Sequence, residues 1–229
     1  MKDFETIAPH FTDDKGGKIL FPFGPPIYQN FISDELKESL LKEAKLMRDQ
    51  DKNFNEGLAG NMFFGGSYNY SIEYFRSIEP QFRNLLFGWF DWMKNNFGHK
   101  RVTFGGMSKE VEISLDNMWV NFQHKYDHNP IHQHNGIVSF VAYLKLDTEI
   151  FKTQAETNTE VAGRLSFHHG EQISPLTSCS YDLEPQENLI LFFPSTLNHI
   201  AYPYWIDGER ISISGNFSAK GVLNINGMG

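Results

Sequence analysis

The chain has little cysteine and no long apolar run, and each shortage excludes a class of protein. Cys179 is the single cysteine among 229 residues, which excludes an intramolecular disulfide and a cystine-stapled scaffold. The longest nearly apolar stretch, residues 137–144, is far shorter than the roughly 18–20 residues that cross a bilayer. The opening Met1-Lys-Asp-Phe-Glu has no signal-peptide character. We therefore expect a cytoplasmic protein without a membrane span.

Basic residues are fewer than acidic ones. Twenty Lys and Arg against 28 Asp and Glu leave a formal charge of −8, which is the wrong sign for a surface that neutralises many phosphates. We therefore do not expect nucleic acid as a large-surface partner. Aromatic residues make up 15% of the chain, the opposite of a disordered composition.

The spacing of apolar residues changes once along the chain, near Lys100. Before that point, apolar stripes at helical spacing predict helices over residues 34–49 and 80–97. Ser33 is a suitable N-cap for the first, and Pro80 is tolerated in the first turn of the second. With no repeat or linker in the sequence, we expect a single domain over residues 1–229, in which a helical support of about 1–100 precedes a β-rich core of about 101–229.

From Val111 onward the period shortens to two, as expected for strands. The predicted strands cover residues 112–125, 137–146, 163–168, 188–193 and 209–217. Turn residues rather than helices separate these strands, which favours a mainly β (α+β) fold. We expect a cupin-like jelly-roll core, of the double-stranded β-helix type, with the N-terminal helices packed outside it. Such a core encloses a cavity between its sheets.

Histidines are concentrated just before the second predicted strand. Four of the nine fall within eleven residues: His124, His128, His132 and His134. Asn129-Pro130 excludes one helical face for them. His132 and His134, at a strand start, would instead point to the same face and reach one ion, with His199 as a third ligand. Three protein ligands leave open positions, as in non-heme Fe(II) oxygenases. By itself, a His-X-His pair leaves structural readings open.

A cation follows eleven residues after His199. On the alternating strand 209–217, Arg210, Ser212 and Ser214 share one face, whereas the isoleucines between them face the other way. If that face lines the cavity, a buried guanidinium requires an anion, and a dicarboxylate would satisfy it with help from the Ser212 hydroxyl. An arginine on a solvated strand face is the alternative that the pattern leaves open.

These residues together resemble the site of Fe(II)/2-oxoglutarate-dependent oxygenases. The closer likeness is to a bacterial and phage group of these oxygenases with the pattern Trp-X-Asn, His-X-His, Ser-X-X-X-Tyr-Leu, Phe-Pro-Ser, His and Arg-X-Ser-X-X-X-Asn. The corresponding elements occur here in order over about one hundred residues: Trp119-Val-Asn121, His132-Gln-His134, Ser139-Phe-Val-Ala-Tyr143-Leu144, Phe193-Pro-Ser195, His199 and Arg210-Ile-Ser212-Ile-Ser-Gly-Asn216. Residues 19–27 also resemble the opening segment of the family.

The resemblance implies roles for some of the matched residues. It implies that His132 and His199 bind Fe(II), with His134 as the third metal ligand. It also implies that Arg210, assisted by Ser212, holds the distal carboxylate of 2-oxoglutarate. Two further residues would contact this cosubstrate: Asn121 and Tyr143. Ser139 shares a strand face with Tyr143, and either could instead be an ordinary strand residue.

Two departures from the family pattern bear on the site. The superfamily's carboxylate ligand is replaced by His134, so the centre would have either three neutral imidazoles or two imidazoles and a water. This removes one negative charge from around the metal; Asp127 is a candidate substitute. At the turn that ends in Asn188, relatives have glycine, but Asn also tolerates the left-handed backbone, so we expect the turn to survive.

The activity implied is that of a dioxygenase using Fe(II), 2-oxoglutarate and dioxygen to hydroxylate an unidentified substrate, with release of succinate and CO2, in the cytoplasm of a bacterium or phage-infected cell. A catalytically inactive metal-binding jelly roll and a structural or carbohydrate-binding sandwich are the alternatives. Three aromatics after the distal histidine would either contact substrate or pack on the sandwich edge: Tyr202, Tyr204 and Trp205.

Overall fold

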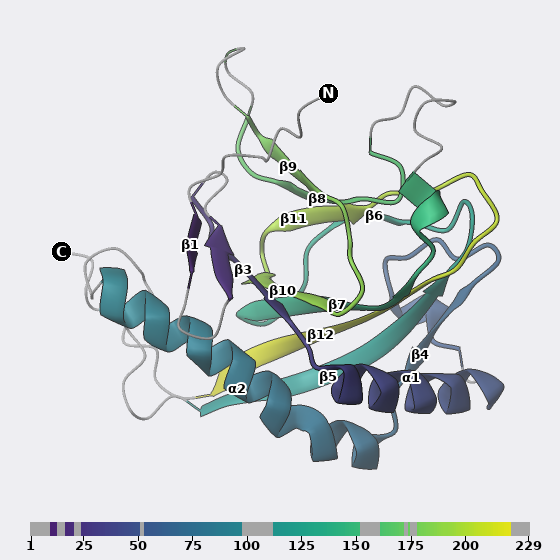
Figure 1. The fold of residues 1–229 in the computed structure, drawn as a ribbon, viewed down its shortest axis with the longest axis horizontal. Helices are drawn as coiled ribbons and strands as arrows, with labels where there is room; N and C mark the ends of the chain where they lie inside the picture. Colours follow the sequence, from purple (N-terminus) through teal and green to yellow (C-terminus); the bar gives the residue numbers. More distant parts are fainter. Residues whose placement is uncertain are drawn as a thin grey trace.

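Figure 1 shows the computed structural model of the chain, in which two helices lie against one of two antiparallel sheets. The structure describes residues 10–12, 17–20, 24–50, 53–97, 112–151, 161–171, 174 and 178–220. The helices are α1 (Asp34–Asp49) and α2 (Ile72–Phe97), with short 3-10 helices η1 (Asn55–Gly57) and η4 (Thr148–Phe151). The strands are β1 (His10–Thr12), β2 (Lys18–Leu20), β3 (Ile27–Phe31), β4 (Gly66–Asn69), β5 (Glu112–Gln123), β6 (Asn129–His132), β7 (Val138–Leu146), β8 (Leu165–His168), β9 (Ser180–Leu183), β10 (Leu189–Pro194), β11 (Asn198–Ala201) and β12 (Arg210–Lys220).

The strands form a large and a small sheet. The large sheet has the order β1-β2-β3-β10-β7-β12-β5-β4, and the small sheet has the order β6-β11-β8-β9. In Figure 1 the small sheet lies over one face of the large sheet, and both helices run along the other. One apolar core joins the helices to the large sheet, and a second lies between the sheets. The expected jelly roll with its helices outside is confirmed.

The first predicted helix has the expected bounds. α1 covers Asp34–Asp49, and the Ser33 hydroxyl accepts a hydrogen bond from the Leu36 backbone N–H at 3.2 Å, as an N-cap does. Leu36, Leu40 and Ala44 lie on its buried face. The local signals of the sequence are therefore sufficient to define this helix.

The second predicted helix was placed too late in the sequence. α2 begins at Ile72, eight residues before the predicted start, so Pro80 lies inside the helix rather than in its first turn. Proline removes one backbone donor there, but Phe75 and Ile78 extend the buried stripe upstream of it. Packing of this stripe on the sheet outweighs the missing hydrogen bond. The expected change of character near Lys100 lies outside the described residues.

The five predicted strands are present with ends shifted by at most three residues, but the prediction that His132 and His134 begin a strand is wrong. His132 is the last residue of β6, and His134 follows it, with its backbone N–H bonded to the Ser195 carbonyl at 2.9 Å. Asn188 adopts φ 67°, so the turn with a left-handed residue does survive.

The long strands β5 and β12 separate polar from apolar side chains. Ile211 and Ile213 belong to the core beneath the helices, whereas Arg210, Ser212 and Ser214 line a cavity on the other face of the sheet. This is the alternation that the sequence predicts, and the cavity is on the side of the small sheet.

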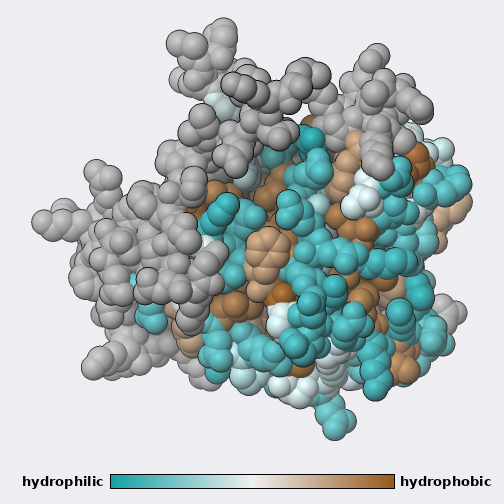
Figure 2. Space-filling view, in the orientation of Figure 1, coloured by the Kyte–Doolittle hydropathy of each residue, from teal (hydrophilic) through white to brown (hydrophobic). Residues whose placement is uncertain are grey.

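The surface is mixed in character. On the face in Figure 2, hydrophobic areas are interspersed with hydrophilic side chains. Among the described residues no helix combines the length and the apolar character needed to span a membrane.

Candidate active site

Three histidines converge between the two sheets. His132 on β6 and His199 on β11 are direct cross-strand partners, and His134 follows β6 closely enough to join them. One ring nitrogen from each of the three lies within 4.8 Å of the others. The sequence interval of 65 residues between His134 and His199 is closed by the antiparallel pairing of β6 with β11.

Backbone carbonyls fix the orientation of two of these rings. The Nδ1 of His132 lies 2.7 Å from the Pro130 carbonyl oxygen, and the Nδ1 of His199 lies 2.9 Å from that of Leu197. Because a carbonyl only accepts, each Nδ1 carries the hydrogen and each Nε2 keeps its lone pair. This is the arrangement by which metal-binding histidines are usually oriented.

Burial also keeps the cluster neutral. Burial lowers the pKa of His132. Burial, and then the repulsion that a second positive charge beside His132 would meet, lower the pKa of His134 to about 4 and that of His199 to about 3. Neutral imidazole is the form that binds a metal ion.

The donor set fits a divalent ion. The Nε2 atoms of His134 and His199 are 3.2 Å apart. Two nitrogens each about 2.1 Å from one ion, at an angle of roughly 90–110°, are about 3.0–3.4 Å apart. Imidazole nitrogens suit iron, zinc, copper and nickel alike, so the donor set is compatible with Fe(II) without being selective for it.

A narrow cavity of about 40 Å³ extends from the histidines to Arg210. It is lined by residues of both sheets, among them all four residues that the sequence assigns to cosubstrate binding: Asn121, Tyr143, Arg210 and Ser212. The structure thus brings the predicted cosubstrate residues and the three histidines to one cavity.

Arg210 is buried without a carboxylate partner. Only 1% of it is exposed, and among the described residues no Asp or Glu oxygen lies within 4.0 Å of its guanidinium. It donates to neutral oxygens: Gln123 Oε1 at 2.9 Å, the Tyr202 carbonyl at 3.4 Å and the Gly163 carbonyl. Burial lowers the pKa of Arg210, yet a guanidinium remains protonated at neutral pH. A buried cation with neutral partners calls for an anionic ligand.

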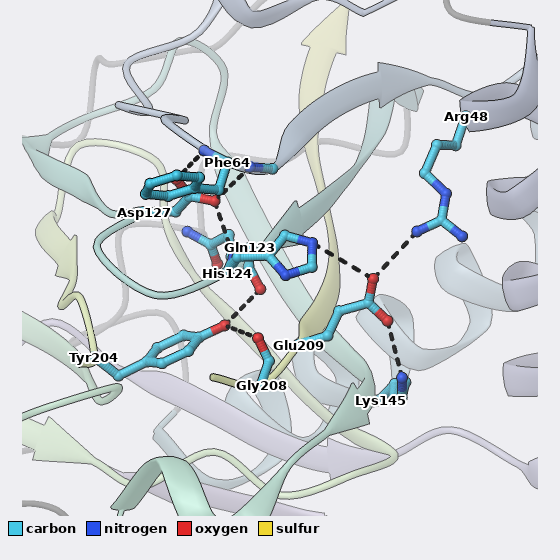
Figure 3. A network of polar contacts seen from close by, with 10 residues as sticks. Arg48, Phe64, Gln123, His124, Asp127, Lys145, Tyr204, Gly208 and Glu209 are labelled. Atoms are coloured by element: carbon cyan, nitrogen blue, oxygen red, sulfur yellow. Dashed lines mark hydrogen bonds and ion pairs between the residues drawn. The ribbon is translucent and has the colours of Figure 1, made fainter. Parts of the chain in front are cut away.

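The adjacent Glu209 is turned toward other cations (Figure 3). Its carboxylate lies 3.1 Å from Arg48 on α1, 2.9 Å from Lys145 on β7 and 3.8 Å from His124. Burial alone would raise the pKa of Glu209, but Lys145 and the other cations outweigh it and lower the pKa. Glu209 therefore connects the start of β12 to α1, and among the described residues no carboxylate contacts the Arg210 guanidinium.

The other predicted cosubstrate residues are also buried beside Arg210. The Oδ1 of Asn121 accepts a hydrogen bond from the Ser67 hydroxyl at 2.7 Å, which leaves its amide N–H groups as donors. Burial raises the pKa of Tyr143 to about 12, so its hydroxyl is protonated. Ser139 does not line the cavity, because it bonds to Ser195 and Asn216 instead.

An open cleft of about 780 Å³ adjoins the narrow cavity. The two share Trp119, His132 and His134. Side-chain amides and aromatic rings dominate the rest of its lining, which includes Phe54, Asn69, Tyr70, Phe75, Asn117, Gln133 and Asn135. Among the described lining residues, Asp116 is the one with a charged side chain. The cleft is therefore larger than the cavity, and its one charged side chain among the described residues is an acid, whereas that of the cavity is the base Arg210.

Asp127 does not belong to the histidine cluster and is not an additional metal ligand. Its fully buried carboxylate accepts four backbone N–H bonds, from Phe63, Phe64, Gly65 and His124 at 2.6–3.0 Å. Figure 3 shows this carboxylate joining the loop at Phe64 to the turn after β5. Its oxygens are committed to the fold, which excludes the suggested substitution for a metal-binding carboxylate.

Other residues singled out in the sequence lie away from the cavities. His124 faces Glu209, and His128 bonds to Asn61 at 3.1 Å. Tyr204 is buried, and its hydroxyl donates to the carbonyls of Gln123 and Gly208 (Figure 3). Tyr202, Tyr204 and Trp205 line neither cavity, which favours the alternative that they pack on the edge of the sandwich.

The sequence interpretation missed two lining residues on β5. Gln123 supports the Arg210 guanidinium, and Trp119 lies at the junction of the cavity with the cleft. Both share a strand face with Asn121, because residues two apart point the same way. The alternation of the strand was therefore the signal that could have identified them.

Comparison with known proteins gives a family and a fold. Residues 117–216 match the model of the family described as "Putative 2OG-Fe(II) oxygenase". No curated protein matches the chain.

Three solved structures are similar over most of the chain. A prolyl-4-hydroxylase from Pseudomonas putida is 15% identical, with a TM-score of 0.55 over 85% of this chain and 93% of that one. HygX from Streptomyces hygroscopicus, solved with nickel, 2-oxoglutarate and hygromycin B, is 10% identical, with a TM-score of 0.51 over 85% and 83%. The carbocyclase SnoK from nogalamycin biosynthesis is 8% identical, with a TM-score of 0.52 over 90% and 85%. At these identities the likeness shows the fold alone.

Proposed function

We propose that the chain uses Fe(II), 2-oxoglutarate and dioxygen to hydroxylate a substrate bound in the open cleft, as a member of the 2OG-Fe(II) oxygenase family whose model matches residues 117–216. The observation that carries the proposal is the pairing, in one cavity, of three neutral histidines with a buried arginine that no carboxylate of the described residues contacts. The first feature suits a metal ion and the second suits a carboxylate.

His132, His134 and His199 would hold the metal. Three protein ligands would leave other positions on the ion for ligands that react. The carbonyls of Pro130 and Leu197 keep two of the rings in the tautomer that presents Nε2. Because all three ligands are neutral, the protein itself contributes no negative charge to the metal centre.

Arg210 would bind the distal carboxylate of 2-oxoglutarate. Three hydrogen bonds to neutral oxygens hold its guanidinium in place, so little side-chain freedom is lost when a ligand binds. Ser212, Tyr143 and Asn121 offer further donors along the same cavity. The narrowness of the cavity favours a slender, unbranched dicarboxylate.

Fe(II) supplies, when bound, the activation of dioxygen coupled to oxidative decarboxylation of 2-oxoglutarate. In the balanced reaction, substrate R–H, O2 and 2-oxoglutarate give R–OH, succinate and CO2, with one oxygen atom in the alcohol and the other in succinate. The chain's own part is to orient the cosubstrate, to exclude water with apolar walls such as Leu165 and Phe193, and to admit the substrate through the cleft that shares His132 and His134.

Anaerobic titration with Fe(II) and 2-oxoglutarate tests this function. We expect a weak visible charge-transfer absorption that needs both components and, after oxygen is admitted, slow formation of succinate without added substrate. The matched titration with Arg210→Lys should require more 2-oxoglutarate. Metal binding without 2-oxoglutarate binding in folded protein would instead favour the inactive metal-binding jelly roll.

A further inference from the structure

We propose that the indole N–H of Trp119 donates a hydrogen bond to the near carboxylate of 2-oxoglutarate, the one next to its oxo group. This inference rests on the proposed function and adds a positioning residue to it. Trp119 is 5% exposed, and its Nε1 is buried without a hydrogen-bond partner among the described residues. Buried donors are nearly always paired, so an unpaired one in the wall of a ligand cavity indicates a ligand acceptor.

The register of β5 with β12 places Trp119 at the histidine end of the cavity. Three cross-strand pairs follow one another along its floor: Gln123 with Arg210, Asn121 with Ser212, and Trp119 with Ser214. At about 3.3 Å per residue, Trp119 lies roughly 13 Å along the strand from the Arg210 end. Its ring centroid is 5.7 Å from that of His134. The cavity therefore has a cationic end and a histidine end, with the indole at the latter.

A dicarboxylate in this cavity has one carboxylate for each end. When Arg210 holds the distal carboxylate, the chain of the ligand extends toward the histidines, and its other carboxylate approaches Trp119. A carboxylate only accepts hydrogen bonds, so it complements an indole nitrogen that only donates. Hydrogen bonds to charged acceptors are also stronger than those between neutral groups.

The burial of Nε1 favours the cosubstrate over the substrate as the acceptor. Trp119 borders both the narrow cavity and the open cleft, but its nitrogen is shielded from solvent. A donor directed into an open cleft would be in contact with water. We therefore assign its partner to the narrow cavity, which Trp119 lines together with the three histidines.

Trp119→Phe tests the assignment, because it removes the N–H and keeps an aromatic ring. The matched control is Trp89→Phe, a buried tryptophan of α2 that packs in the core on the opposite face of the large sheet. Equilibrium dissociation constants are measured anaerobically with Fe(II) for two ligands. One is 2-oxoglutarate, and the other is levulinate, which keeps the distal carboxylate and the oxo group but has a methyl group in place of the near carboxylate.

We expect Trp119→Phe to weaken 2-oxoglutarate binding about tenfold and levulinate binding less than twofold, since only the former offers the acceptor. Trp89→Phe should change neither. Equal weakening of both ligands by Trp119→Phe would mean that the ring only packs against the site, and unchanged 2-oxoglutarate binding would mean that the N–H has another partner. Either result overturns the inference.

The same measurement separates this inference from the proposed function. If the wild-type protein does not bind 2-oxoglutarate in the presence of Fe(II), the proposed function itself fails. If the wild-type protein and Trp119→Phe bind it equally well, only the role of Trp119 fails.

Discussion

His132 and His199 lie directly opposite each other on β6 and β11, and each is held by a hydrogen bond from Nδ1 to the carbonyl two residues earlier. The pairing of two short strands thus positions two imidazoles with their Nε2 atoms available. Neither ring needs to change its tautomer to bind a metal ion.

Replacing one of the paired histidines should abolish tight metal binding. We expect His199→Ala to lower the affinity for Fe(II) by at least about 100-fold, since two remaining imidazoles form a much poorer site. Anaerobic equilibrium dialysis followed by metal analysis measures the effect. His168→Ala, on the adjacent strand β8, is the control and should bind one equivalent of Fe(II). A fully loaded His199→Ala protein would contradict the assignment of this ligand.

Arg210 should govern cosubstrate affinity more than metal affinity. We expect Arg210→Lys to weaken 2-oxoglutarate binding about 10- to 100-fold, because an ammonium cannot reproduce the fork of the guanidinium. The content of Fe(II) should stay the same. Isothermal calorimetry under nitrogen measures both, and Arg76→Lys, on α2, provides the control. Unaltered 2-oxoglutarate affinity in Arg210→Lys would show that the distal carboxylate binds elsewhere.

Asp127 should stabilise the fold without contributing to metal binding. The two carboxylate oxygens of Asp127 accept four backbone N–H bonds, whereas an amide offers one acceptor oxygen. We therefore expect Asp127→Asn to lower the free energy of unfolding by about 2–4 kcal/mol. Urea denaturation measures this loss, and hydrogen exchange should become faster at Phe63 to Gly65. Asp147→Asn, where the carboxylate accepts one backbone N–H, should lose less than about 1 kcal/mol. Loss of Fe(II) from folded Asp127→Asn would contradict this assignment.

Glu79 should make stability depend on pH. Its carboxylate on α2 accepts hydrogen bonds from Arg76, Arg83 and the Leu115 backbone N–H. Burial alone would raise its pKa, but these partners outweigh burial and lower it. A lowered folded-state pKa means that the stabilisation is complete above the unfolded value near 4.5 and is lost as the pH falls through the folded value.

The test compares Glu79→Gln with the wild-type protein by urea denaturation at pH 7 and at acid pH. We expect the variant to be about 1–3 kcal/mol less stable at pH 7 and the difference to shrink below about pH 4. The control is Glu73→Gln, at an exposed position of the same helix, which should differ little at either pH. A difference for Glu79→Gln that is independent of pH would exclude the ionised carboxylate as its source.

Much of this protein follows from short-range patterns in its sequence. The cap at Ser33 and the apolar stripe behind it define α1, because helix signals act within a few residues. The alternation around Arg210 and Ser212 predicts that both side chains share one face of a strand, because the period of a strand is two. The crowding of His132 and His134 also indicated a shared task, but the strand geometry expected for the pair was wrong, because β6 ends at His132.

Other features were decided by contacts between distant parts of the chain. The register of β11 with β6 brings His199 to His132. Backbone N–H groups of the loop at Phe64 donate hydrogen bonds to the Asp127 carboxylate. Burial against the sheet extends α2 upstream of Pro80. Local sequence cannot specify these outcomes, because the pairing of strands and the burial of a carboxylate depend on which remote groups the whole fold packs against them. The sequence by itself therefore determined the kinds of side chain available and the faces they share, whereas the tertiary structure decided which of them meet.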